Sequence, residues 1–124
     1  MGTETLTDLQ LAVMTALWEV GEGGVSEILA IMARNGTEIA PTTVATLLQR
    51  LTKQGWVEHR SQGRHFVYRA KVAREEAAKT VVDRVLQSFF GGKASALTAQ
   101  LLESDKLTSD ELEEMRRLLK EKGR

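Results

Sequence analysis

Apolar residues recur every three or four positions through most of this chain, which is the spacing expected of amphipathic helices. In the first half, the pattern predicts three short helices, over residues 8–20, 25–34 and 41–54. In the second half, it predicts three further helical segments, over residues 73–90, 94–103 and 108–119. The chain is therefore expected to be mainly α-helical.

Residues with strong positional preferences mark several helix boundaries. Thr7 followed by Gln10 fits a capping box at the start of the first helix. Residues 21–24, GEGG, predict a short turn after that helix. Pro41 suits the first turn of the third helix, because the backbone N–H that proline lacks would be unpaired there anyway. Gly55 suits the left-handed residue that ends a helix.

The stretch that follows the third helix, residues 56–69, predicts a β-hairpin. Aromatic and β-branched residues flank a glycine turn over residues 61–64. We expect Val57 to pair on the inner face with Phe66 or Tyr68. Three short helices followed by a two-stranded ribbon give the element order of a winged helix-turn-helix domain, in which the third helix is the recognition helix.

The third helix has an apolar stripe on one side and polar side chains on the other. By itself this pattern favours an ordinary solvent-exposed face, because any surface helix is built in this way. The hairpin favours a DNA surface instead, with helix side chains in the major groove and hairpin cations near phosphates. The residues expected at the duplex are Thr42, Thr43, Thr46, Gln49, Arg50 and Lys53 on the helix, and Arg60, Arg64 and His65 on the hairpin.

Charge is distributed unevenly along the chain, although the net charge of the 124 residues is zero. Residues 1–38 hold one cation and six anions, whereas residues 39–71 hold six cations and one anion. A basic segment of this kind favours phosphate binding, because neutralising phosphates supplies most non-specific affinity for nucleic acids. The basic segment begins at the third helix.

The C-terminal part of the chain is helical in pattern throughout. Thr108 with Glu111 predicts a second capping box. A piece this short buries too little surface to be stable alone, so we expect residues 72–124 to form a homodimerisation domain beside a DNA-binding domain over residues 1–71. The alternative is a helical cap folded back on the N-terminal domain. The expected dimer contacts are Val81, Val82, Val85, Leu86, Phe89, Phe90, Leu97, Leu101, Leu112, Met115 and Leu119.

Composition argues against several other classes of protein. The chain has no cysteine, which excludes disulfides, thiolate metal sites and cysteine nucleophiles. No apolar run approaches the roughly 20 residues of a membrane span, and no basic leader precedes the first helix, so we expect a cytoplasmic protein without membrane contact. His59 and His65, the only histidines, could face one another across the hairpin, but a third ligand is missing. We therefore expect no metal, no cofactor and no enzymatic activity.

Several stretches together carry a resemblance to a known family. They are Leu6-Thr7, Trp18, Thr42–Val44, Leu47–Leu51, Gly55–Val57, Gly63-Arg64, Phe66, Tyr68, Phe90–Gly92 and Leu107–Leu119. In this ordered set the chain resembles the penicillinase-repressor family of bacterial transcription factors, the BlaI, MecI and CopY type. The resemblance extends over nearly the whole chain and implies a homodimeric repressor of a dyad operator in double-stranded DNA.

The resemblance also implies how repression ends. In similar proteins, either a protease cuts the dimerisation arm, downstream of a membrane-bound β-lactam sensor, or a cysteine cluster binds metal. The absence of cysteine excludes the metal route as usually built, and a regulatory protease stays open as a further partner. The Asn-Phe pair cut in those proteins corresponds here to Gln100-Leu101, so the inducing signal stays open. A winged-helix module that docks a protein, and an effector-responsive regulator without proteolytic control, stay open as alternatives.

Overall fold

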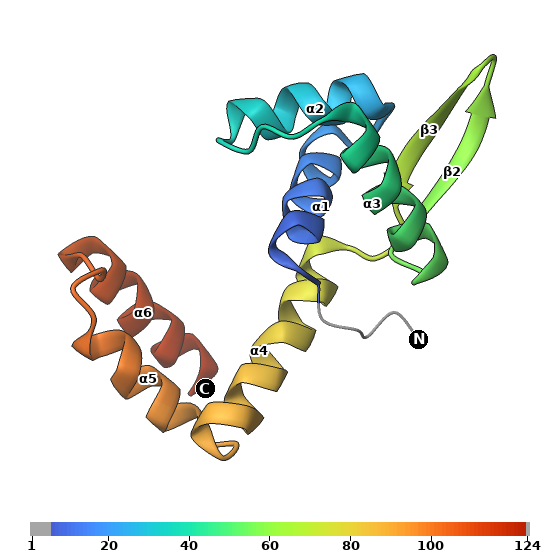
Figure 1. Ribbon diagram of the computed structural model, residues 1–124. Coiled ribbons are helices and arrows are strands. Elements are labelled where there is room, and N and C mark those ends of the chain that lie inside the picture. The colour runs from blue at the N-terminus through green and yellow to red at the C-terminus, as the bar shows by residue number, and fades with distance from the viewer. Residues whose placement is uncertain (1–5, 124) are drawn as a thin grey trace. The chain divides into compact units, whose positions relative to one another are not determined.

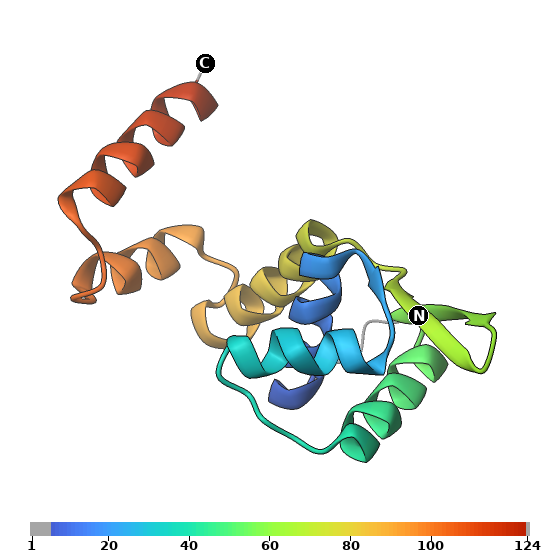
Figure 2. The ribbon, with the colours of Figure 1, turned by 90° about the horizontal axis from the view of Figure 1, so that it is seen from above.

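The computed structural model describes residues 6–123 and divides into two compact units, Met1–Val81 and Val82–Arg124 (Figures 1 and 2). The first unit holds α1 (Asp8–Val20), β1 (Glu22–Gly23), α2 (Val25–Arg34), α3 (Pro41–Lys53), β2 (Val57–Gln62) and β3 (His65–Ala70). The remaining helices are α4 (Arg74–Phe90), which crosses the division, α5 (Ala94–Glu103) and α6 (Ser109–Lys122). The expected class, mainly α with a small β-hairpin, is confirmed.

The predicted division of function between residues 1–71 and 72–124 stays a prediction. The extreme ends of these two segments, residues 1–5 and 124, lie outside the described residues. Among the described residues, the structural division falls inside α4, because Ala77 is still part of the core of the first unit.

A capping box begins α1 as predicted. Thr7 Oγ1 accepts a hydrogen bond from the backbone N–H of Gln10 at 3.1 Å, and Gln10 Oε1 accepts one from the backbone N–H of Thr7 at 3.0 Å. The amide of Gln10, a residue only 5% exposed, also donates to Gln54 Oε1 at 3.3 Å. Since Gln54 is the C-cap of α3, this buried bond joins the start of α1 to the end of α3.

One apolar core fixes how α3 is turned about its own axis. Val44, Leu47, Leu48 and Leu51 are buried in this core together with side chains of α1, α2 and the hairpin. Rotating α3 to hide its polar side would expose these four side chains, at a cost of about 6–12 kcal/mol. That cost is comparable with the whole stability of a small domain, so the core holds the polar side of α3 outward.

The sheet has three strands in the order β1-β3-β2, and both pairings are antiparallel. The prediction of a simple turn over residues 21–24 is therefore wrong in part, because Glu22 and Gly23 form a strand against β3. Gly21 supplies the change of direction with a φ of +82°. Two residues are too few to show the alternation of apolar and polar positions that predicts a strand. This strand forms only because β3, which is distant in the sequence, pairs with it.

The hairpin turn is tighter than predicted. β2 continues to Gln62, which pairs with His65, so the turn contains only Gly63 and Arg64 rather than residues 61–64. Gly63 has a φ of +64°, the left-handed conformation that two-residue hairpin turns require. The tight turn places Arg64 at the tip of the hairpin.

The register of the hairpin also differs from the prediction. Val57 pairs with Ala70, not with Phe66 or Tyr68, because the turn length determines which residues oppose one another. The inner face itself is assigned correctly, since Val57 and Tyr68 are both buried. Phe66 lies on the same face, nearer the tip, and is 47% exposed.

The second unit presents apolar side chains at its surface. No side chain within residues 82–123 is fully buried, and Phe89 and Leu119 are 79% and 71% exposed. Thr108 Oγ1 accepts from the backbone N–H of Glu111 at 3.2 Å, which is one of the two bonds of the predicted capping box. Of the predicted dimer contacts, Val81, Val82, Phe89, Leu101, Leu112 and Leu119 are exposed, and Val85, Leu86, Phe90, Leu97 and Met115 are half-buried.

Candidate nucleic-acid interface

The exposed side of α3 carries every helix residue that the sequence predicts at a duplex: Thr42, Thr43, Thr46, Gln49, Arg50 and Lys53. The helix starts from Ala40, whose side chain cannot cap it, followed by Pro41 at the first position. Thr46 donates its hydroxyl hydrogen to the carbonyl oxygen of Thr42 at 3.0 Å, which leaves the lone pairs of the hydroxyl outward. The surface therefore changes along the helix from hydroxyl groups to an amide and two cations.

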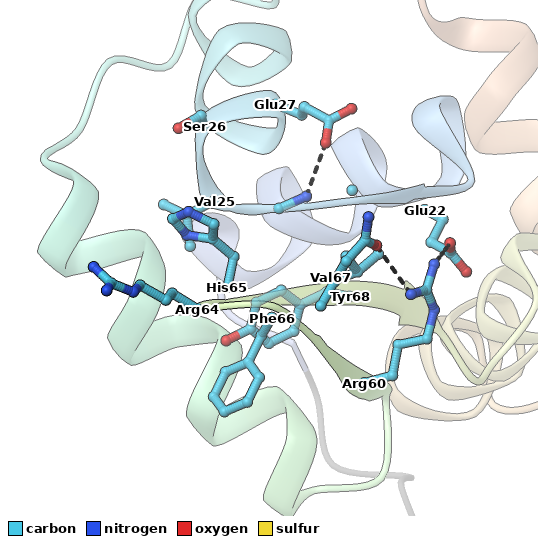
Figure 3. A pocket seen from close by; sticks show the side chains of 13 residues that line it. Glu22, Val25, Ser26, Glu27, Arg60, Arg64, His65, Phe66, Val67 and Tyr68 are labelled. Atoms are coloured by element: carbon cyan, nitrogen blue, oxygen red, sulfur yellow. Dashed lines mark hydrogen bonds and ion pairs between the residues drawn. The ribbon is translucent and has the colours of Figure 1, made fainter.

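The hairpin has two chemically different faces. Successive strand residues point to opposite sides, and Figure 3 shows His65 on the side of α2 and Phe66 on the other side. A hollow of about 570 Å³ on the α2 side is lined by Arg64 and His65, and also by Glu22 and Glu27. Arg64 and His65 are exposed, as predicted for residues at a phosphate backbone.

Arg60 is already engaged by neighbouring side chains. Its guanidinium donates to Glu22 Oε1 at 2.6 Å and to Gln62 Oε1 at 3.0 Å (Figure 3). Arg69 forms an ion pair with Glu58. Carboxylates thus neutralise two of the six cations counted in the basic segment. The cations without an ion pair, among the described residues of that segment, are Arg50, Lys53, Arg64 and Lys71.

A second hollow, of about 380 Å³, lies between α3 and the hairpin. Three aromatic rings form its hairpin wall, with the His59 ring centroid 4.3 Å from that of Phe66 and 5.5 Å from that of Tyr68. Burial raises the pKa of the Tyr68 hydroxyl above its ordinary value. The α3 wall consists of Gln49, Thr52 and Lys53.

Phe66 is not among the DNA-contacting residues predicted from the sequence, and the sequence predicts His59 only as a surface or phosphate-contacting histidine. His59 and His65 do not face one another, because His59 pairs with Tyr68 and His65 pairs with Gln62. These pairings put the two histidines on opposite faces of the hairpin. Strand alternation counted from the buried Val57 would have found the face on which His59 lies.

The remaining predictions concern metal, membrane and protease sites. Within residues 6–123, no group of three or more His, Asp or Glu side chains is arranged to hold a metal ion. No helix in the same range is long and apolar enough to cross a membrane. Gln100 and Leu101, the counterpart of the pair cut in similar proteins, lie inside α5 and are exposed.

The first unit is a winged helix-turn-helix domain. It has three short helices, a hairpin after the third helix and a polar side of that helix that faces outward. The model of the penicillinase repressor family matches residues 6–121, which is nearly the whole chain. The protein belongs to the penicillinase repressor family.

Individual relatives agree with this assignment. The chain is 28% identical to the penicillinase repressor of Bacillus licheniformis over 116 residues, covering 94% of this chain and 90% of that protein. It is 22% identical to the methicillin resistance regulatory protein MecI of Mammaliicoccus sciuri over 120 residues, covering 97% of each.

Two solved structures of the repressor BlaI are also similar. The solution structure of its DNA-binding domain is 29% identical, with a TM-score of 0.50, and the match covers 58% of this chain and 87% of that one. The monomeric Bacillus licheniformis form in complex with the blaP half-operator is 27% identical, also with a TM-score of 0.50. That match covers 60% of this chain and 89% of the other.

Proposed function

We propose that the protein is a cytoplasmic, homodimeric transcriptional repressor that binds a dyad operator in double-stranded DNA. The observation that carries the proposal is the outward polar side of α3, which four buried side chains hold in place beside an exposed hairpin. Membership of the penicillinase repressor family supports it. The complex of a relative with a half-operator supports duplex DNA as the partner.

In this proposal, α3 enters the major groove. Thr42, Thr43 and Thr46 face bases or nearby phosphates, and Gln49 can make two hydrogen bonds to an adenine. Arg50 can bond a guanine or a phosphate. A bidentate contact of either kind contributes about 1–3 kcal/mol of discrimination between bases.

The phosphate contacts come from the end of α3 and from the hairpin. Lys53 and Arg64 carry charges that no carboxylate pairs with among the described residues, and His65 lies beside Arg64. Arg60 can reach a phosphate only by leaving Glu22, so its contribution to affinity is the smallest of these four. Its larger role is to hold the hairpin against β1.

The dimer forms through α4, α5 and α6. Exposed apolar side chains in residues 82–123, where no described side chain is fully buried, suit association with a second copy of the same surface. A two-fold axis then presents two copies of α3 to a dyad operator. The predicted contacts of the arm and the cutting of Gln100-Leu101 by a regulatory protease stay predictions, and the inducer stays open.

Two variants separate base contacts from phosphate contacts. Arg64→Ala should weaken binding to all duplex sequences alike and reduce the slope of log affinity against log salt by about 0.9. Gln49→Ala should relax the preference at one base pair and keep the salt slope. Arg34→Ala is the matched control, because it removes an arginine from α2 that pairs with Glu19.

The measurement is a fluorescence anisotropy titration of each variant at several salt concentrations. A change of sequence preference in Arg64→Ala, with its salt slope unchanged, would contradict this division of roles. Negligible affinity of the unmodified protein for any duplex at low salt would favour a protein-docking winged helix instead.

A further inference from the structure

The hollow between α3 and the hairpin differs in charge from the opposite face of the hairpin. Its lining contains one lysine and no carboxylate: Gln49, Thr52, Lys53, His59, Phe66 and Tyr68. The hollows on the other face contain Glu22, Glu27 and Glu58 together with Arg60, Arg64 and Arg69. The hollow beside α3 therefore has a positive charge that no carboxylate in its lining offsets, which attracts a polyanion, whereas carboxylates and arginines offset one another in the other hollows.

We infer that this hollow holds one sugar-phosphate strand of the duplex, and that His59 and Phe66 are direct DNA contacts. The inference rests on the proposed function, because it requires α3 to occupy the major groove. Each edge of a major groove is a phosphodiester strand. If α3 lies in the groove and the hairpin lies on the backbone beside it, the strand between them passes through this hollow.

The donors around the hollow suit a phosphate. The Lys53 ammonium forms no ion pair with any described residue, and the exposed His59 ring and the Gln49 amide offer N–H groups beside it. Charge-assisted hydrogen bonds of this kind are the stronger contacts available to a phosphate oxygen. Each donor comes from a rigid helix or strand.

Phe66 suits the sugar between two phosphates. Its ring is 47% exposed, although it is a large apolar side chain, whereas Tyr68 on the same face is buried. His59 at 4.3 Å and Tyr68 at 6.2 Å between ring centroids hold the ring in place. Because the ring is already ordered, covering it with the apolar face of a deoxyribose costs little entropy.

The test compares neighbouring residues on the two faces of the hairpin. Phe66→Ala removes the proposed sugar contact, and Val67→Ala is the matched control because strand alternation points Val67 to the opposite face. Thermal unfolding followed by circular dichroism establishes that both variants are folded. The probe is a mixed-sequence duplex at low salt, since contacts to the backbone do not depend on sequence.

We expect Phe66→Ala to bind the duplex about fivefold more weakly with an unchanged salt slope, because no charge is lost. His59→Gln should bind about threefold more weakly, and Lys53→Ala should also lower the salt slope by about 0.9. Val67→Ala should bind like the unmodified protein.

Three other outcomes would contradict the inference, and one of them would also contradict the proposed function. If the unmodified protein binds the duplex and both Phe66→Ala and His59→Gln bind equally well, the inference is wrong and the proposed function stands. If Val67→Ala loses as much affinity as Phe66→Ala, the effect comes from the fold of the hairpin and the inference is again wrong. If the unmodified protein binds no duplex, the proposed function fails and the inference fails with it.

Discussion

Phe89 gives the sharpest prediction about the proposed dimer. It is 79% exposed on α4, in a region without fully buried side chains. Fully burying a phenylalanine contributes roughly 1.5–3 kcal/mol, so covering the exposed part of this ring is worth about 2 kcal/mol. A symmetric dimer buries two such rings, which gives about 4 kcal/mol.

A Phe89→Asp variant loses this contribution and also brings a carboxylate to an apolar interface. Since each 1.4 kcal/mol changes an equilibrium constant tenfold, the dissociation constant of the dimer should rise by at least about a thousandfold. Gln87→Asp is the matched control. It adds the same charge to the same last turns of α4, but two residues away along a helix it points to the opposite side.

Sedimentation equilibrium over a range of protein concentrations measures both dissociation constants. We expect Phe89→Asp to be a monomer at concentrations where the unmodified protein and Gln87→Asp are dimers. Equal dimer stability in all three proteins would refute the placement of the interface on this side of α4. Loss of the dimer in Gln87→Asp as well would show that charge alone, and not the ring, controls association.

Three predictions concern the first unit. Gln10→Ala removes a buried amide that bonds to Thr7 and Gln54, and should lower the free energy of unfolding by about 1–3 kcal/mol in urea denaturation. Tyr68 is the only tyrosine, so the absorbance of tyrosinate during a pH titration reports this residue alone. Because burial raises the pKa of Tyr68, the midpoint of that titration should lie above 10.0. Because the folded pKa is raised, stability should fall as the pH rises through the pKa range of tyrosine. Trp56→Phe should lower the free energy of unfolding by much less than the roughly 3–5 kcal/mol of Trp56→Ala, because the buried indole N–H has no hydrogen-bond partner among residues 6–123.

Each of these three predictions has a result that would contradict it. An unchanged unfolding midpoint for Gln10→Ala would mean that the bond to Gln54 does not hold α1 to α3. A tyrosinate midpoint at or below 10.0 would mean that the hydroxyl of Tyr68 is not desolvated in the fold. Equal losses for Trp56→Phe and Trp56→Ala would mean that the indole N–H is bonded in solution.

The helices could be predicted closely because their signals are local. The signals for α1 are a capping box at its start and a glycine at its end, and the signal for α2 is the spacing of its apolar residues. Each of these signals depends on residues within a few positions of each other. The bounds of α1 and α2 therefore agree with the prediction. The strand Glu22–Gly23 could not be predicted in this way, because β3 alone makes it a strand.

The exposed side of α3 could be predicted residue by residue, but the contacts within the hairpin could not. The exposed side of α3 follows from the same period as its buried side, so Thr46 and Gln49 could be selected from the sequence. The ion pair of Arg60 depends on Glu22 being in the sheet. The face on which His59 and Phe66 lie follows from strand alternation, but their place beside Gln49 and Lys53 of α3 depends on how the hairpin packs against that helix.

The central claim, that the outward side of α3 reads the sequence of a duplex, is tested most directly by selecting bound duplexes from a random pool. The account predicts enrichment of a palindromic motif by the unmodified protein. It predicts that Gln49→Ala, selected in parallel, loses the preference at one symmetric pair of positions and keeps the rest. A pool that shows no enrichment, or an identical motif from both proteins, would contradict the account.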